Sequence, residues 1–227
     1  MNEHRTKLPV VIVCGLHSEA RREVVEGLLR DVPHSVALHH DLSTATGGTV
    51  RRSLRDVGGE LASGEAPLVN ACACCALRED LVPELERLAE DGRTRLVVLE
   101  LWDSVEPKSM AEVIAAHTTA AVVTNVFAAV DPTLVLPCLS NGDDLAEAGL
   151  AAAPADRRTI GDTWARQVEY APVLAMAPSP VADDEDRALI RQLNPTARQA
   201  ASGSAELARL AFAGFDVEAA DAGQHPA

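Results

Sequence analysis

Aromatic side chains are few in this sequence: Phe, Trp and Tyr together make up 3% of its 227 residues. The hydrophobic core must therefore be built mainly from Val, Leu and Ala. Long apolar runs are also missing, since no segment approaches the roughly 18 consecutive apolar residues that identify a membrane-spanning helix. The polar start of the chain, Met1 to Lys7, lacks the apolar centre of a secretion signal, so we expect a cytoplasmic protein.

Basic residues are outnumbered by acidic ones. The chain has 20 Lys and Arg against 34 Asp and Glu, which gives a formal net charge of −14 at pH 7. Such a chain is repelled by the phosphates of nucleic acids and by anionic lipids, so neither nucleic acid nor membrane is expected as a partner. This charge does not exclude a locally basic pocket for a nucleotide, and it leaves the oligomeric state open.

The cysteines do not form the pattern of a disulfide framework. There are five, and three of them, Cys72, Cys74 and Cys75, lie within four positions, whereas Cys14 and Cys138 stand alone. In a reducing compartment such a cluster indicates metal ligands or redox thiols. Cys72 and Cys75 have the Cys-x-x-Cys spacing of redox thiols, but Cys74 between them favours metal ligation. The G-x-S-x-G and H-E-x-x-H motifs are absent, and no catalytic residue is predicted.

Short apolar runs alternate with amphipathic segments of helical length along most of the chain. The first run, Leu8 to Cys14 (LPVVIVC), is continuous, as in a strand buried on both faces. The alternation predicts an α/β fold with a mostly parallel sheet and helices on both faces. We expect strands at 8–14, 35–40, 66–70, 95–101, 120–129, 172–177 and 196–201, and helices at 19–32, 49–63, 77–88, 109–117, 157–170 and 182–193. From Gly214 onward the acidic, non-periodic sequence predicts a linker or a flexible tail.

Ligands of such sheets bind at the carboxyl ends of the strands, and the cysteine cluster follows one of the expected strands. Three thiolates form a soft site that suits Zn²⁺ or Cu⁺. Zinc prefers four ligands, and His39, His40 or Cys14 could supply the fourth, because their strands end at the same edge. Two alternatives remain open. The cysteines could be small side chains buried in the core, with no metal. The two histidines could simply form the polar end of a strand, and only one of their rings can face the ligand side of the sheet. Cys138 has no neighbouring partner in the sequence and is expected to be inert.

The segment from Leu68 to Glu84 reads LVNACACCALREDLVPE. It resembles the defining segment of the CobW family of metal-handling GTPases, in which Asn-Gly-Cys-x-Cys-Cys precedes a helix that opens with Leu-Arg-x-Asp-Leu. Only the glycine differs, since Ala71 stands in its place. Glu106-Pro107, the QVEYA of 167–171 and the LNPTA of 193–197 also resemble family segments, so the resemblance covers roughly residues 8–202.

This resemblance implies a P-loop NTPase-like nucleotide-binding domain over residues 1–203, followed by a terminal helix and flexible tail at 204–227. It implies zinc held by Cys72, Cys74 and Cys75, GTP with magnesium as the nucleotide cofactor, and delivery of the metal to a client metalloprotein. Family members usually continue into a smaller β-rich C-terminal domain, which we expect to be absent here.

The first nucleotide motif of the family is altered in this sequence. The family pattern G-x-x-G-x-G-K-[ST] becomes GLHSEARR at 15–22. Gly15 is kept, Ser18 and Ala20 replace glycines that let the backbone approach phosphates, Arg21 stands at the lysine, and Arg22 at the hydroxyl that holds Mg²⁺.

The other two nucleotide motifs are altered as well. The family's Glu-x-x-Gly becomes Glu100-Leu101-Trp102-Asp103, and its guanine-reading Asn-Lys-x-Asp becomes the APSP of 177–180. The nucleotide contacts that the resemblance implies are therefore limited to Gly15, Ser18, Arg21, Arg22 and Glu100.

Three functions fit this combination of motifs. The first is a metal-binding protein of the CobW type, a zinc chaperone whose GTP site is weak or inactive. The second is an active GTP-binding metallochaperone that uses a divergent phosphate loop. The third is a non-catalytic pseudo-GTPase that binds a protein partner, in which the cysteines would be structural. The sequence favours the first, and Arg21 and Arg22 could still hold a phosphate weakly.

Overall fold

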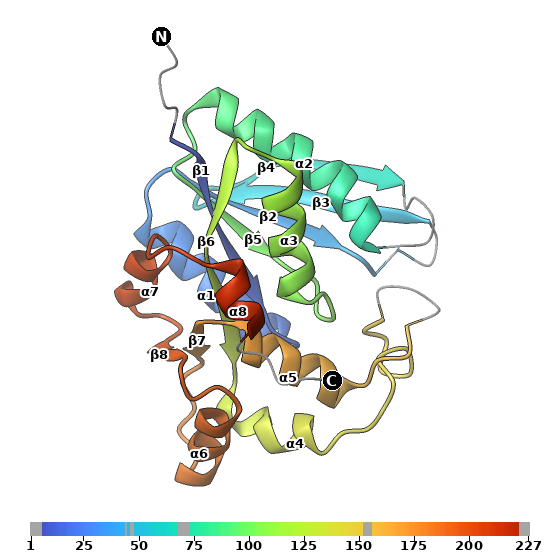
Figure 1. The fold of residues 1–227 in the computed structure, drawn as a ribbon, viewed down its shortest axis with the longest axis vertical. Coiled ribbons are helices and arrows are strands. Elements are labelled where there is room, and N and C mark those ends of the chain that lie inside the picture. Colours follow the sequence, from blue (N-terminus) through green and yellow to red (C-terminus); the bar gives the residue numbers. More distant parts are fainter. Residues whose placement is uncertain (1–5, 44, 46–47, 68–72, 152–155, 223–227) are drawn as a thin grey trace.

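The structure, a computed structural model, describes residues 6–43, 45, 48–67, 73–151 and 156–222, with side chains described from residue 78 onward in the helix that begins at Ala73. Eight strands form one sheet in the order β4-β3-β2-β5-β1-β6-β7-β8 (Figure 1). The six parallel strands are β1 (Leu8–Cys14), β2 (Ser35–Asp41), β5 (Leu96–Glu100), β6 (Ala121–Val130), β7 (Val173–Met176) and β8 (Arg198–Ala201). The prediction of a mostly parallel α/β sheet is confirmed.

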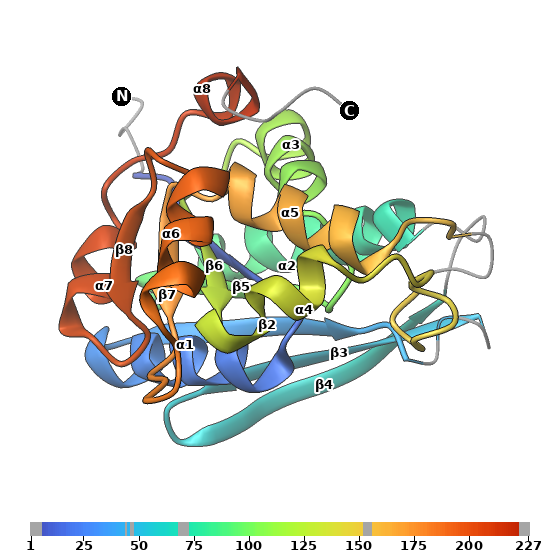
Figure 2. The same cartoon turned by 90° about the horizontal axis from the view of Figure 1, so that it is seen from below.

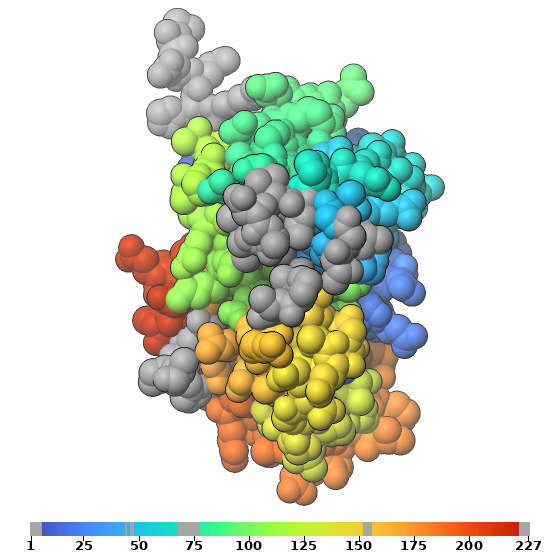
Figure 3. Space-filling model, turned by 90° about the vertical axis from the view of Figure 1, so that its right-hand side faces the viewer, coloured from blue at the N-terminus to red at the C-terminus, as the bar shows by residue number. Residues whose placement is uncertain are grey.

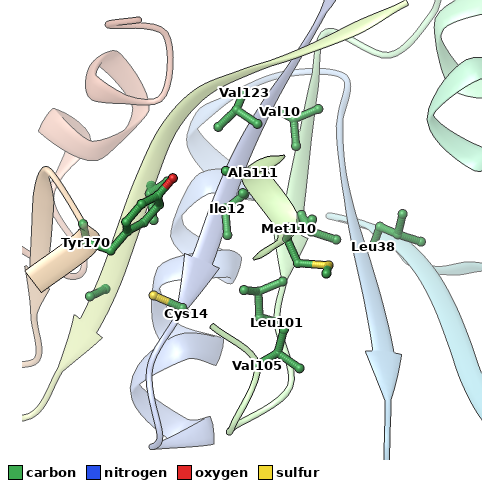
Figure 4. Packing of buried hydrophobic residues seen from close by; sticks show 14 of the residues in the cluster. Val10, Ile12, Cys14, Leu38, Leu101, Val105, Met110, Ala111, Val123 and Tyr170 are labelled. Carbon is green, nitrogen blue, oxygen red and sulfur yellow. The ribbon is translucent and has the colours of Figure 1, made fainter. Parts of the chain in front are cut away.

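Helices cover both faces of the sheet, as predicted. One face packs against α1 (Ser18–Asp31) and α7 (Ala205–Leu210), whose side chains share a core with β1, β5 and β7. The other face packs against α2 (Ala73–Asp91), α3 (Pro107–His117), α5 (Ile160–Tyr170) and α6 (Asp184–Leu193) (Figure 2). The second core is made largely of aliphatic residues, and Figure 4 shows Ile12 and Met110 within it. Among the described residues, no helix is long and apolar enough to cross a lipid bilayer.

The prediction of a helix at 49–63 is wrong. These residues form the antiparallel hairpin of β3 (Thr49–Asp56) and β4 (Gly59–Pro67), which adds two strands beside β2 (Figure 3, cyan). Val50 and Leu54, the buried pair of β3, are four residues apart, an interval that places side chains on one side of both a helix and a strand. Val57 and Gly58 form the turn, and Gly59, the first residue of β4, adopts φ 128°, which favours glycine. Of the strand expected at 66–70, residues 66–67 belong to β4 and the rest lies outside the described residues.

Two shorter segments also differ from expectation. Helix α2 begins at Ala73, four residues before the expected start, so Cys74 and Cys75 lie in its first turn and not in an extended stretch. The chain after Gly214 is not entirely irregular, because α8 (Val217–Ala222) follows α7. Phe215 packs edge-on against Tyr170 with ring centroids 5.8 Å apart, and Asp221 pairs with Lys108 of α3. A few tertiary contacts thus order a segment that local sequence left undefined.

Between β6 and α5 the chain forms η3 (Pro132–Leu134), α4 (Val135–Leu139) and a long connection. The yellow segment that follows α4 lies below the hairpin in Figure 3. Residues 152–155 of this connection lie outside the described part of the chain.

Candidate functional site

The altered phosphate loop lies between β1 and α1. Strand β1 ends at Cys14 and α1 begins at Ser18, so only three residues connect them. Gly15 has φ 136°, and a Cβ there would lie 2.6 Å from the carbonyl oxygen of Ala129, so this position requires glycine. Five of the eight motif residues, 18–22, are helical, whereas a phosphate loop lies between a strand and the helix whose N-terminus faces the phosphate. The N–H of Arg21 donates to the carbonyl of His17, at 3.1 Å, within this first turn.

The side chain of Arg21 joins two of the altered motifs. It is 2% exposed, and its guanidinium donates to the carbonyl of Gly15 and to the carboxylate of Asp103. Asp103 stands where the family has the glycine of Glu-x-x-Gly. The positive charge at the lysine position of the motif is therefore already paired with a carboxylate of the same chain.

The remaining predicted nucleotide contacts surround this pair. Ser18 and Arg22 are exposed on α1 and line a hollow of about 470 Å³. The carboxylate of Glu100 in the same hollow pairs with Arg55 of β3, with Oε2 and Nη2 3.4 Å apart. The predicted residues therefore lie at one edge of the sheet, but two of the three arginines there are paired with carboxylates.

A second hollow, of about 460 Å³, opens on the other side of the β1–α1 connection. Ala177 and Pro178, from the altered guanine motif, line it. Its charged side chains are the carboxylates of Glu19, Glu23 and Asp131, and neither Lys nor Arg is among its described lining residues. Nucleotide phosphates would meet negative charge on this side.

The two histidines at the end of β2 point to opposite faces of the sheet. His39 shares a hydrogen bond of 3.0 Å between its Nδ1 and the carbonyl of Glu100. His40 lies on the side of α2, and its Nε2 is 2.8 Å from Oδ2 of Asp80. Each ring thus has one nitrogen bound to an oxygen, the arrangement that commonly orients the other nitrogen of a metal-ligating histidine.

Asp80 lies at the centre of a partly buried network under α2. Its Oδ1 accepts from Nη1 of Arg52 at 3.0 Å, and Arg52 also approaches Glu84 at 3.6 Å. Burial raises the pKa of Asp80, but the hydrogen bonds and charges of His40 and Arg52 outweigh burial and hold this pKa below its usual value. The network fixes α2 against the hairpin, and α2 carries the cysteine motif at its first turn.

The predicted cysteine site is only partly within the described structure. Cys72 lies outside the described residues, as do the side chains of Cys74 and Cys75, although the backbone of α2 places the last two at the helix start. Where side chains are described, no three His, Cys, Asp or Glu residues converge as a metal site.

The two lone cysteines are both buried. Cys14 was a candidate fourth ligand, but it is a core residue with no exposed area, among the apolar side chains of Figure 4. Burial raises the pKa of its thiol to about 12. Cys138 has no neighbouring partner in the sequence, but in the structure its Sγ lies 3.9 Å from Nε2 of His17. The two residues are 121 positions apart, so no local spacing could have indicated this pair.

A family model for the CobW/HypB/UreG nucleotide-binding domain matches residues 56–204, well over half of the chain. The chain belongs to the CobW/HypB/UreG family. This confirms the resemblance that the cysteine motif indicated.

Curated relatives of this CobW-family chain carry zinc-related names. A "zinc-regulated GTPase metalloprotein activator" of Dictyostelium discoideum is 26% identical over 141 residues, which is 57% of this chain and 30% of the relative. A "zinc chaperone" of Mycobacterium tuberculosis is 28% identical over 228 aligned positions, covering 92% of this chain and 52% of the relative. The chain thus spans about half, or less, of the length of these relatives.

Among solved structures, a zinc-bound triple mutant of the YjiA GTPase has the same fold. The TM-score is 0.50 and the sequence identity 16%, with 86% of this chain and 58% of the other covered. The P-loop NTPase fold of this chain is thereby confirmed.

Proposed function

We propose that this chain is a zinc-binding protein of the CobW type that passes zinc to a client metalloprotein and whose nucleotide site binds GTP weakly or not at all. Zinc is here the cargo, and Cys72, Cys74 and Cys75 are its proposed ligands. The proposal rests on family membership, on the retained cysteine motif and on the zinc-related names of the relatives.

His40 is the proposed fourth ligand or the residue that orients the site. It lies on the α2 face of the sheet, whereas His39 lies on the other face. Asp80 follows Cys75 by five residues, about 7.5 Å along the helix axis at ~1.5 Å per residue. His40 therefore contacts α2 little more than one turn from the cysteines. A client cysteine or water would complete the shell if His40 remains bound to Asp80 alone.

The Arg21–Asp103 pair is the observation that carries the proposal of a weak GTP site. A phosphate would have to displace the Asp103 carboxylate from a guanidinium that is 2% exposed. Of the backbone groups in this turn, the N–H of Arg21 is committed within the helix that begins at Ser18. Three carboxylates line the neighbouring hollow. Breaking this buried ion pair costs free energy, which reduces the net gain from binding a phosphate to Arg21.

Arg22 supports the alternative of an active, divergent GTP site. It is exposed beside the 470 Å³ hollow and has no carboxylate partner among the described ion pairs. An anion could bind there without breaking the Arg21–Asp103 pair. The pseudo-GTPase alternative would instead be supported by cysteines that bind no metal.

A zinc titration of the reduced protein against a chromophoric chelator, with and without Mg-GTP, separates the three functions. We expect one tightly bound equivalent of zinc, whose affinity Mg-GTP leaves unchanged. A zinc affinity that shifts with GTP would show by linkage that nucleotide binds, and would favour the divergent GTPase. Absence of zinc binding in both conditions would favour the pseudo-GTPase.

The variant Arg21→Lys/Asp103→Gly restores the family residues at two positions and is the matched test of the weak site. If the ion pair blocks phosphate, this variant should bind a fluorescent GTP analogue more tightly than the native chain. Equal affinity would show that the short connection between β1 and α1, and not the pair, limits binding.

A further inference from the structure

The contact between His17 and Cys138 brings together two side chains that commonly bind soft metals. His17 immediately precedes α1, and Cys138 lies in α4, with Sγ and Nε2 3.9 Å apart. Cys138 is 5% exposed, and His17 lines the 460 Å³ hollow beside the altered phosphate loop. Nδ1 of His17 is buried without a hydrogen-bond partner among the described residues.

The separation of the two atoms fits one shared metal ion. Zinc binds cysteine sulfur at about 2.3 Å and histidine nitrogen at about 2.0–2.1 Å, so two such ligands of one tetrahedral ion lie roughly 3.5 Å apart. The observed 3.9 Å requires a shift of only a few tenths of an ångström. A thiol and an imidazole also suit Cu⁺, which accepts two or three soft ligands.

The surrounding charge favours a cation. Glu19, Glu23 and Asp131 line the hollow, and its described lining residues include neither Lys nor Arg. Asp131 is held in place because its Oδ1 accepts from the N–H and the hydroxyl of Thr133, at 2.9 and 2.7 Å. Arg21 lies nearby, but its charge is paired with Asp103.

The protonation states allow metal to bind with release of one proton. Burial lowers the pKa of His17, against the opposing charge of Asp131, so the imidazole is neutral near pH 7 and its Nε2 can bind a metal. Burial raises the pKa of the Cys138 thiol to about 11. Its proton therefore leaves to solvent when the sulfur–metal bond forms.

We propose that His17 and Cys138 form a second soft-metal site, where His17 borders the hollow beside the altered phosphate loop, and that this site is distinct from the three-cysteine motif. It has two protein ligands, since no third His, Cys, Asp or Glu joins them among the described residues. The remaining positions are open to water or to an exchanging ligand. The site binds zinc more weakly than three thiolates do and exchanges it more readily.

The test uses the full chain with Cys72, Cys74 and Cys75 all changed to Ser, which removes the proposed main site. We expect this protein to bind one equivalent of zinc, and Co²⁺ to give the charge-transfer absorption of a single thiolate ligand. Adding Cys138→Ser should abolish both signals, and adding His17→Gln should weaken binding by roughly tenfold or more. Cys14→Ala is the matched control, because that thiol is fully buried and should leave the signals unchanged.

Two results would overturn the proposal. One is a triple-serine protein that binds no zinc, and the other is binding that survives Cys138→Ser while the circular dichroism shows an intact fold. Cadmium NMR of the native chain provides the check without substitutions, because the His17–Cys138 site should give a one-sulfur signal separate from the three-sulfur signal. If the native chain gives the one-sulfur signal but no three-sulfur signal, the result counts against the proposed function and not against the second site.

Discussion

Two polar clusters at the same edge of the sheet illustrate two uses of buried charge. Arg21, Asp103 and the carbonyl of Gly15 form a closed group at the centre of the edge, under the start of α1. His40, Asp80, Arg52 and Glu84 form an extended group that joins β2 and β3 to α2. The first lies at the altered phosphate loop, whereas the second supports the helix that carries the proposed zinc ligands. Substitution at the first has produced a self-contained pair, and at the second the family residue Asp80 is kept as an anchor.

The largest expected effect lies in the region that keeps its family motif. Changing Cys74 to Ser should lower zinc affinity by orders of magnitude, because it removes one of three proposed thiolate ligands. The free energy of unfolding of the metal-free protein should hardly change, since α2 is held by Asp80 and its core residues. Competition with a chromophoric chelator measures the affinity. Unchanged affinity would exclude Cys74 as a ligand.

The next largest effect is expected on the free energy of unfolding when the closed group loses Asp103. Asp103→Ala should destabilise the fold by about 3 kcal/mol, because it leaves the buried guanidinium of Arg21 without its counter-ion. Urea unfolding followed by circular dichroism measures this loss. Arg198→Ala breaks the exposed pair with Glu206 and should cost no more than about 1 kcal/mol. Similar losses in the two variants would mean that the Arg21–Asp103 pair is solvated and available to phosphate.

Substitution in the extended group should lower the free energy of unfolding by a smaller amount, and this loss should depend on pH. Asp80→Asn should cost about 2 kcal/mol near pH 7, since it weakens charge-assisted hydrogen bonds to His40 and Arg52. The folded-state pKa of Asp80 is lowered, so its contribution is fully present above its ordinary pKa of about 4 and is lost as pH falls through the lower folded value. The stability difference between native and Asp80→Asn protein, measured by urea unfolding, should therefore shrink in acid. A difference that stays constant from pH 7 to pH 3 would contradict this assignment.

The smallest effect is expected next to Arg21 in the sequence. Arg22→Ala should change the free energy of unfolding by less than about 0.5 kcal/mol, because its exposed side chain has no ion-pair partner in the described structure. Zinc affinity should also stay the same. Isothermal titration with Mg-GTP checks the remaining possibility. If the native protein binds nucleotide and Arg22→Ala does not, Arg22 and not Arg21 holds the phosphate, and the nucleotide site binds GTP.

Much of the fold followed from the sequence. Apolar runs such as Leu8–Cys14 marked the parallel strands, since strands buried on both faces have few polar residues. The hairpin at 49–67 was missed, because the spacing of Val50 and Leu54 suits a helix as well as a strand. Only the pairing of β3 with β2 distinguishes the two.

Some features of the candidate site likewise followed from the sequence, and others only from the tertiary structure. The sequence by itself indicated the family, the retained cysteine motif and the altered residues at the three nucleotide motifs, because each is a short run of neighbouring residues. Only the tertiary structure decided that Arg21 pairs with Asp103, that His40 and not His39 faces α2, and that Cys138 meets His17. Each of these contacts joins residues on different elements, and their distances are set by how helices pack on the sheet rather than by spacing along the chain.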